Sequence, residues 1–275
     1  MTRALAVALL LLAGCDRKAD QNGAVSATPA ALTYEGANYR NAAEKVAHGK
    51  RLATILDCTG CHGTNLQGSD LAEKPEDGAM YAPNLTLLLA KYSDAQLDRL
   101  IRGGVPRDGR EFWFMPVESY QFLSDADLAA IIAYLRTVEP AGKPLPAFQK
   151  NRALEKEIAA GTIGNAQAQI AKFRKETPVD LGPEHAWGRY LAQNSCSACH
   201  NNSLQGWEGF TPSLDVAGAY SKEELTHLLT IGEGKVKKDL GMMTGIARNS
   251  FSKLTPRERE AIVDYVKARA ERLAR

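Results

Sequence analysis

Two five-residue motifs constrain this chain more than any other feature of its sequence. They run Cys58-Thr59-Gly60-Cys61-His62 and Cys196-Ser197-Ala198-Cys199-His200. Because positions i, i+3 and i+4 of a helix share one face, each motif brings two thiols and an imidazole together. The chain has five cysteines in 275 residues, and Cys15 is the one that lies outside the two motifs.

The CxxCH spacing is the attachment signature of haem c. The two cysteines bond the haem vinyl groups, and the histidine, here His62 or His200, reaches the iron. Two motifs therefore predict two covalently bound haem c groups. A four-cysteine zinc site is disfavoured because Cys58 and Cys196 are far apart in the sequence. A thioredoxin-like dithiol is disfavoured because strand signals are scarce.

The two motifs belong to an internal repeat that extends over most of the chain. Leu66-Gln67-Gly68 follows His62 at the same offsets at which Leu204-Gln205-Gly206 follows His200. Further matches pair Gly49 with Gly188 (with one residue of slippage before the cysteines), Pro83-Asn84-Leu85 with Pro212-Ser213-Leu214, Tyr92-Ser93 with Tyr220-Ser221, and Gly103 with Gly232. Each half closes with a helical pattern that starts at Ser124-Asp125 or at Thr255-Pro256. The sequence thus predicts an all-α protein with two copies of one small unit.

With these motifs the chain resembles class I cytochromes c, and more closely the dihaem members that serve periplasmic dehydrogenases. The resemblance covers residues 36–140 and 178–275 and implies two tandem cytochrome c domains. In that fold the first helix crosses the last helix at a small residue, with an aromatic side chain packed against it. Gly49 with Tyr134, and Gly188 with Tyr265, match these positions. We expect the two units to have separate cores.

The resemblance also implies the iron ligands. Members of the family place a proline after the CxxCH motif, and its carbonyl accepts the Nδ1 proton of the ligand histidine; Pro83 and Pro212 match it. The fifth ligands are then His62 and His200. For the first haem, Met115 in Phe112-Trp113-Phe114-Met115-Pro116 matches the sixth ligand, whereas Met80 precedes Pro83 and is expected to pack in the core.

In the second repeat Met242 and Met243 are adjacent, and the family pattern favours Met243, with Met242 as the alternative. His48 and His185 are expected to be solvated or capping residues, and are the alternatives if a haem has two histidine ligands. With a methionine closing each site, the resemblance implies relatively high potentials and no coordination position for a substrate.

The N-terminus predicts export and lipidation. Arg3 precedes the apolar residues 4–13, which have the shape of a signal peptide and are too few to span a bilayer. The run Leu12-Ala13-Gly14-Cys15 resembles a bacterial lipobox, which implies cleavage after residue 14 and lipid on Cys15. The alternative is an ordinary signal peptide that is cut later. Residues 15–35 are then a flexible tether on a periplasmic, membrane-anchored protein.

The charge balance and the order of the domains indicate which partners and which function to expect. Lys and Arg total 34 and Asp and Glu total 32, so no excess positive charge favours nucleic acid as a partner. Residues 141–177 are a linker that forms either helical segments bracing the domains or a solvated connection. The resemblance implies transfer of single electrons between periplasmic redox proteins, as a carrier or as the cytochrome subunit of a dehydrogenase, without catalytic residues. The alternative is a dihaem cytochrome c peroxidase, which needs one open or bis-histidine haem.

Overall fold

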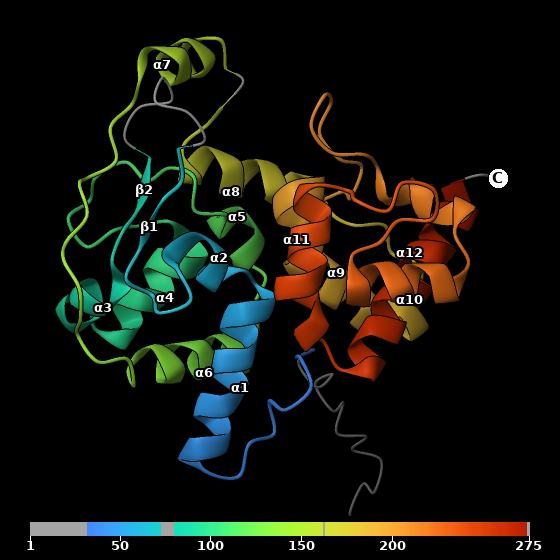
Figure 1. The fold of residues 1–275 in the computed structure, drawn as a ribbon, viewed down its shortest axis with the longest axis horizontal. Helices are drawn as coiled ribbons and strands as arrows, with labels where there is room; N and C mark the ends of the chain where they lie inside the picture. The colour runs from blue at the N-terminus through green and yellow to red at the C-terminus, as the bar shows by residue number, and fades with distance from the viewer. Residues whose placement is uncertain (1–31, 73–79, 162, 274–275) are drawn as a thin grey trace, which may run out of the picture. The chain divides into compact units, whose positions relative to one another are not determined.

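The computed structural model describes residues 32–72, 80–161 and 163–273, and nearly all of their regular secondary structure is helical (Figure 1). The all-α class that the sequence predicts is confirmed. The predicted signal peptide, residues 1–14, and the predicted lipidation site Cys15 lie outside the described residues. Along the described chain, no helix is long and apolar enough to cross a membrane.

The first repeat contains two long helices, with short elements between them. In chain order these are α1 (Ala42–Ile55), α2 (Cys58–His62), β1 (Ser69–Asp70), β2 (Tyr81–Ala82), α3 (Leu85–Leu88), the 3-10 helix η2 (Leu89–Lys91), α4 (Asp94–Gly103), α5 (Val117–Tyr120) and α6 (Asp125–Leu135). The strands β1 and β2 pair antiparallel, with Ser69 opposite Ala82.

The second repeat has its main helices in the same order, and an isolated bridge between Trp207 and Thr211 stands where the first repeat has its two short strands. It contains η3 (Pro183–His185), α9 (Ala186–His200), η4 (Leu214–Ala219), α10 (Lys222–Ile231), α11 (Met242–Asn249), η5 (Phe251–Lys253) and α12 (Pro256–Leu273). The single helix α9 replaces α1 and α2, because the CxxCH motif continues the helix here without a break.

Each repeat is built on a crossing of its first and last long helices at a glycine. A Cβ atom built on Gly49 of α1 would overlap the carbonyl oxygen of Ala130 in α6. A Cβ on Gly188 of α9 would overlap the carbonyl oxygen of Ala261 in α12 and crowd the Tyr265 side chain. Any side chain would force the helices apart, so the crossing explains why glycine occurs inside helices, where its propensity is poor.

The start and end signals of the α4 and α10 helices also repeat. Ser93 and Ser221 each form a capping box with the residue at the third helical position, Gln96 or Glu224. The helices end at residues in the left-handed conformation, Gly104 with φ 60° and Gly232 with φ 79°. The match of Gly103 with Gly232 is therefore wrong by one residue. Gly103 is the last residue of α4, and Gly104 is the residue that ends the helix as Gly232 does.

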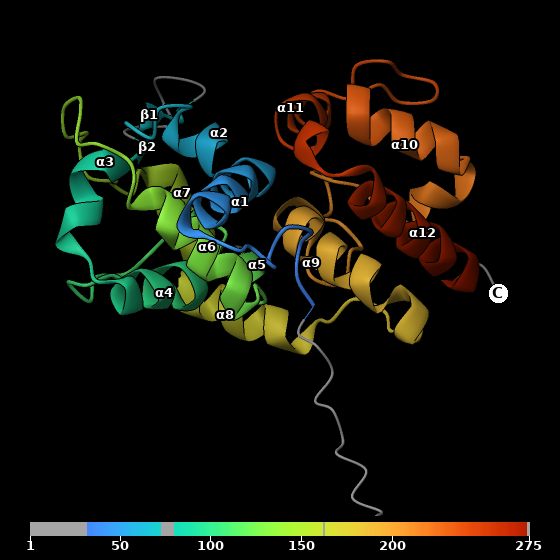
Figure 2. The same ribbon diagram turned by 90° about the horizontal axis from the view of Figure 1, so that it is seen from below.

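The expectation of separate cores is wrong. The buried apolar side chains form one continuous cluster that includes residues of both repeats, from Leu52 and Leu128 to Leu191 and Val266. One reason is the short helix α5, which contacts α9 of the other repeat. Figure 2 shows α5 and α8 between the other helices of the first repeat and α9.

The linker contains two helices, α7 (Arg152–Ala159) and α8 (Ala166–Lys175), and α8 braces the repeats. Ile170 of α8 packs with Val117 of α5 in a second small apolar cluster. On the other side, Phe173 stacks on Trp207 of the second repeat, with ring centroids 6.5 Å apart. The backbone carbonyl of Phe173 also accepts a hydrogen bond from Asn202 Nδ2 at 2.6 Å.

Residues 33–36, which include a turn at residues 35 and 36, lie between the repeats, and we call this segment the strap. Its Tyr34 amide donates to Asp127 Oδ2 of α6 at 3.0 Å. The Tyr190 hydroxyl of α9 donates to the same oxygen at 2.7 Å, and Tyr34 and Tyr190 pack edge to face. Asp127 is completely buried, so this carboxylate joins the strap to both repeats. The sequence places residues 33–35 in the flexible tether, whereas here they are packed.

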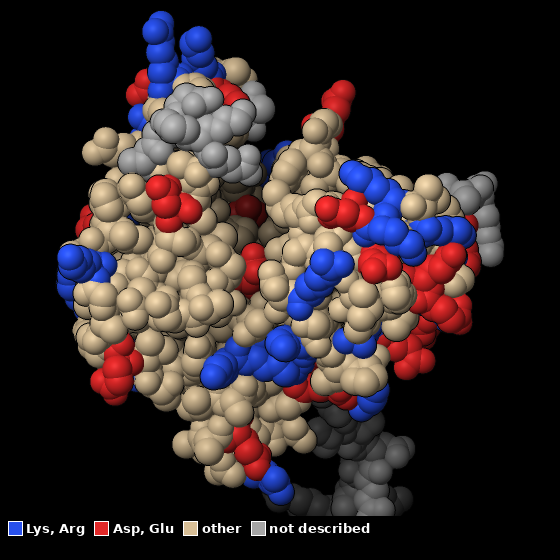
Figure 3. Space-filling model, viewed as in Figure 1, with Lys and Arg blue, Asp and Glu red and all other residues tan. Residues whose placement is uncertain are grey.

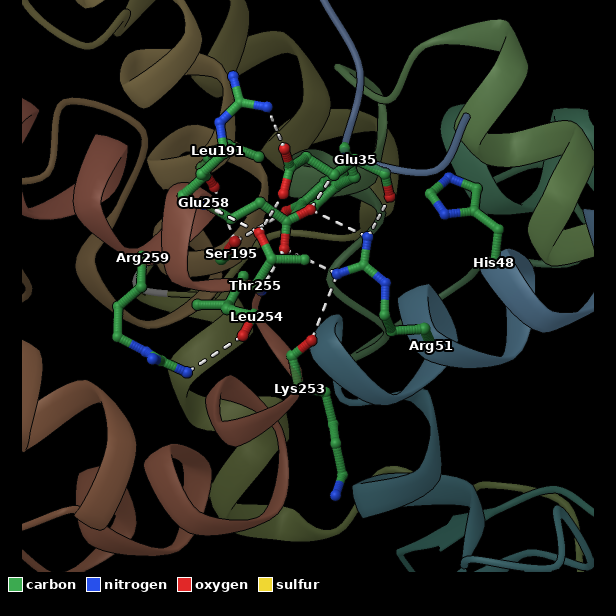
Figure 4. Close-up of polar contacts among 12 residues, drawn as sticks. Glu35, His48, Arg51, Leu191, Ser195, Lys253, Leu254, Thr255, Glu258 and Arg259 are labelled. Atoms are coloured by element: carbon green, nitrogen blue, oxygen red, sulfur yellow. Dashed lines mark hydrogen bonds and ion pairs between the residues drawn. The ribbon is translucent and has the colours of Figure 1, made fainter. Parts of the chain in front are cut away.

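A second buried carboxylate holds the other side of the strap, as Figure 4 shows. Glu258 of α12 is completely buried. It accepts the Glu35 amide at 2.9 Å and an ion pair from Arg51 of α1 at 2.7 Å. Buried carboxylates need such complete pairing because an uncompensated buried charge is costly. These contacts fix the two repeats against each other.

Candidate haem-binding sites

The structure brings each CxxCH histidine to the proline that the family pattern assigns to it. His62 Nδ1 lies 3.0 Å from the carbonyl oxygen of Pro83, and His200 Nδ1 lies 2.8 Å from that of Pro212. A carbonyl oxygen can only accept, so Nδ1 carries the proton in both rings. The other ring nitrogen, Nε2, is then the one with a free lone pair in the neutral histidine.

The surroundings of both imidazoles favour this neutral form. Burial lowers the pKa of His62 and of His200, and the hydrogen bond to the proline carbonyl opposes this effect. A neutral ring that donates from one nitrogen and presents the other is the arrangement found in histidines that bind metals. Both rings therefore have the chemistry of an iron ligand.

A loop of the same shape brings the proline back to the histidine in each repeat. Leu66 and Leu204 have positive φ angles of 59° and 62°, which L residues seldom adopt. The amides of Gly68 and Gly206 donate to the carbonyl oxygens of His62 and His200, both at 2.8 Å. A side chain on Gly68 or Gly206 would overlap backbone atoms of the returning strand, so the Leu-Gln-Gly matches in the sequence mark a structural turn.

The four motif cysteines are unpaired, and their chemistry is that of protonated thiols. Burial raises the pKa of all four, to about 12 for Cys58 and Cys196. Dithiol redox catalysts have the opposite shift, because they need thiolate. Among the described residues, no three His, Cys, Asp or Glu side chains cluster so as to hold a metal ion. The zinc and dithiol alternatives therefore find no support, whereas two thiols and a neutral imidazole on one helix fit haem c.

Met115 lies where the first ligand is expected, just before α5. Its side chain is half-buried and packs against both apolar clusters, so α8 of the linker covers this segment. Its carbonyl oxygen accepts the Val117 amide at 2.7 Å, which ties the Met-Pro turn to α5. The half-buried Met80 lies before β2, and its carbonyl oxygen accepts the Leu71 amide.

The structure separates the two methionine candidates of the second repeat. Met242 is the first residue of α11, and 57% of it is exposed. Met243 is half-buried and packs against the main apolar cluster, which includes Cys196. Adjacent helical residues point in different directions, so one of the two can face the core. This geometry favours Met243, as the family pattern does.

The expectation that His48 is solvated or capping is wrong. His48 is 5% exposed, and its Nε2 lies 3.0 Å from Asp127 Oδ1 in α6. His185 is half-buried at the end of η3. Because the Nε2 of His48 has a buried carboxylate partner, His48 belongs to the contacts between strap and repeats rather than to a haem.

Some residues around the sites carry no signal in the sequence. The Tyr120 hydroxyl donates to the Leu56 carbonyl oxygen at 2.7 Å, next to the first CxxCH motif. Ser197, inside the second motif, donates to Ser119 of α5 at 2.8 Å, and both serines are completely buried. These contacts join the second attachment helix to the segment that follows Met115.

This fold, with a CxxCH helix, a proline-held histidine and a packed methionine in each repeat, defines a c-type cytochrome. The sequence model of the cytochrome c family matches residues 46–139 and 186–270. The chain therefore belongs to the cytochrome c family, and both repeats are cytochrome c domains.

Three relatives of this chain are subunits of dehydrogenases. The chain is 26% identical over 226 residues to a subunit of the nicotinate dehydrogenase of Pseudomonas putida, a match that covers 69% of this chain and 18% of that protein. It is 26% identical to the fructose dehydrogenase cytochrome subunit of Gluconobacter japonicus, covering 81% and 52%. It is 25% identical to the gluconate 2-dehydrogenase cytochrome c subunit of Pantoea cypripedii, covering 81% and 59%. The chain thus spans less than two thirds of each relative.

Replacing Met115 or Met243 by histidine is expected to lower one haem potential each, because imidazole favours ferric iron relative to a thioether. Met242→His is the matched control, since its side chain is largely exposed to solvent, and it should leave both potentials unchanged. Redox titration with near-infrared spectra, which report methionine ligation, measures the effect. If Met242→His moved a potential and Met243→His did not, the assignment of the second ligand would be wrong.

Proposed function

We propose that this chain binds two covalent haem c groups and passes single electrons between redox partners outside the cytoplasm. The observation that carries the proposal is the duplication of one complete site. In each repeat a CxxCH motif, a histidine held by a proline carbonyl, and a core-facing methionine occur together. If one of the two sites did not bind haem, we would not expect all of these residues to occur in both repeats.

Different residues of the two sites have different roles in the proposed electron transfer. Haem, when bound, supplies an iron that changes between ferric and ferrous states by one electron. Pro83 and Pro212 fix the orientation and the tautomer of the two histidines. The Nε2 atom of each ring, which would hold the iron, therefore keeps a fixed direction. The apolar cluster around Met115 and Met243 excludes water from the ligand side. With His62 and Met115 holding one iron, and His200 and Met243 the other, both sites would serve electron transfer rather than substrate binding.

We propose a dehydrogenase as the electron donor. The relatives named above are dehydrogenase subunits, and two are called cytochrome subunits. A cytochrome subunit takes electrons one at a time from the catalytic subunit and passes them on, which matches two closed haem sites on one chain. The same relatives give the peroxidase alternative no support.

Anaerobic mixing experiments test this function. The reduced protein should be oxidised at both haems by a one-electron acceptor such as ferricyanide, and it should turn over hydrogen peroxide no faster than free haem c peptide. Rapid peroxide turnover with a five-coordinate haem signal would replace the electron-transfer proposal by the peroxidase alternative.

We further propose that lipid on Cys15 anchors the protein to a membrane, motivated by the run Leu12-Ala13-Gly14-Cys15. Each buried CH₂ of an acyl chain contributes about 0.8 kcal/mol, so several chains hold a protein durably. Cys15→Ala is expected to block processing, and the uncut precursor should accumulate without lipid. Mass spectrometry of the wild-type mature N-terminus is the check, and an unacylated terminus would reject the anchor.

A further inference from the structure

Asp57 is the residue at which the two repeats differ most clearly next to a haem motif. The first repeat has one more residue than the second between the crossing glycine and the first motif cysteine. Asp57 accommodates the additional residue. Its left-handed backbone conformation, with φ 58°, separates α1 from α2. Its counterpart before Cys196 is Ser195, inside the unbroken helix α9. The slippage therefore places a carboxylate at one motif only.

The backbone turn aims this carboxylate back over the motif. A Cβ built on Gly60 would overlap both carboxylate oxygens of Asp57, so the group lies directly above the middle of Cys58–His62. A larger residue at position 60 would displace this carboxylate. Asp57 Oδ1 then accepts a hydrogen bond from Ser250 Oγ at 2.9 Å. Ser250 belongs to the second repeat, directly after α11, the helix that carries Met243.

The same carboxylate also adjoins the second repeat. Its partner Ser250 directly follows α11, and the Ser250 amide donates to the Ile246 carbonyl oxygen of that helix at 2.9 Å. In the orientation of Figure 1, the molecular surface is hollowed between α2 and α11, and acidic atoms lie inside this hollow (Figure 3). Asp57 thus joins the first motif to the helix that carries the methionine of the second site.

We propose that Asp57, held by Ser250, is a shared electrostatic residue of the two haem sites that lowers both haem potentials. The inference rests on the proposed two-haem function. A fixed negative charge favours the ferric form, which has one more positive charge than the ferrous form. Because Asp57 is half-buried, solvent and salt screen it less than a surface carboxylate. One residue can act on two haems because it lies over the first motif and is bonded to the segment that follows Met243 of the second site.

Asp57→Asn tests the charge with little change of shape. Asparagine tolerates the left-handed conformation as aspartate does, and its carbonyl oxygen can still accept from Ser250. In an optical redox titration of the holoprotein at pH 8, both one-electron steps should move to higher potential. The expected change is about tenfold in the equilibrium constant of each reduction, which corresponds to about 59 mV for a one-electron couple.

Two controls separate this effect from others. Asp125→Asn removes the same charge from a side chain that is 93% exposed on α6, and it should move neither step. Ser250→Ala keeps the carboxylate, and both its potentials should stay below those of Asp57→Asn.

The haem content of every variant is measured first. Fewer than two haems in the wild type would refute the proposed function itself. With two haems present, a shift of one step alone, no shift, or an equal shift in Asp125→Asn would overturn the shared role of Asp57.

Discussion

Gly49→Ala is expected to be less stable than the wild type by about 2 to 3 kcal/mol, within the range of overpacked sites in protein interiors. The added methyl group would overlap the Ala130 carbonyl oxygen, which is backbone and cannot rotate away. Helices α1 and α6 would have to separate along their crossing. Chemical denaturation of the holoprotein, followed by circular dichroism, measures the free energy of unfolding.

Gly103→Ala is the matched control in the same repeat. Its Cβ would meet only the Val105 side chain, at an ordinary distance of 3.8 Å. Alanine has the better helix propensity by up to about 1 kcal/mol, so this variant should be as stable as the wild type or more stable. Equal losses in both variants would show that the helix crossing has no special demand for glycine.

The second large effect concerns haem attachment. Cys58→Ala combined with Cys61→Ala should halve the covalently bound haem, because the thiols of the second motif lie on another helix and cannot replace them. Cys196→Ala with Cys199→Ala should remove the other half. After acid acetone extraction, the haem that remains with each denatured chain is measured.

The two double variants also check each other. Each should keep one haem, and their spectra should add up to that of the wild type. If one double variant lost both haems, the sites would not be independent attachment units. Haem that was extracted freely from the wild type would contradict covalent attachment altogether.

The parts of this fold that the sequence predicts are those with local causes. The CxxCH spacing depends on helix geometry alone, the capping serine Ser124 acts within one turn, and Gly49 stands out because glycine is unfavourable inside a helix. Each of these signals occurs once in each repeat. The prolines that hold His62 and His200 were expected from the resemblance to class I cytochromes c, and the structure places both of them at the histidines.

The contacts between the repeats had no such signal. His48 has the pattern of a surface residue in the sequence, because its partner Asp127 is far along the chain and ordinary as a helix-start residue. The strap has the pattern of a tether because its backbone amides, rather than its side chains, join Asp127 and Glu258. The slippage at Asp57 was visible as a length difference, but its meaning depends on Ser250, which only the tertiary structure brings near.

We propose that one chain carries two cytochrome c sites in which side chains hold the iron on both faces of the haem, and intact mass spectrometry with a reductive titration tests this proposal. We expect a denatured wild-type chain that is heavier by two haems, and a holoprotein that takes up two electrons while both haems stay six-coordinate. A chain that carried one haem or none, or a haem with an open iron position in the resting protein, would contradict it.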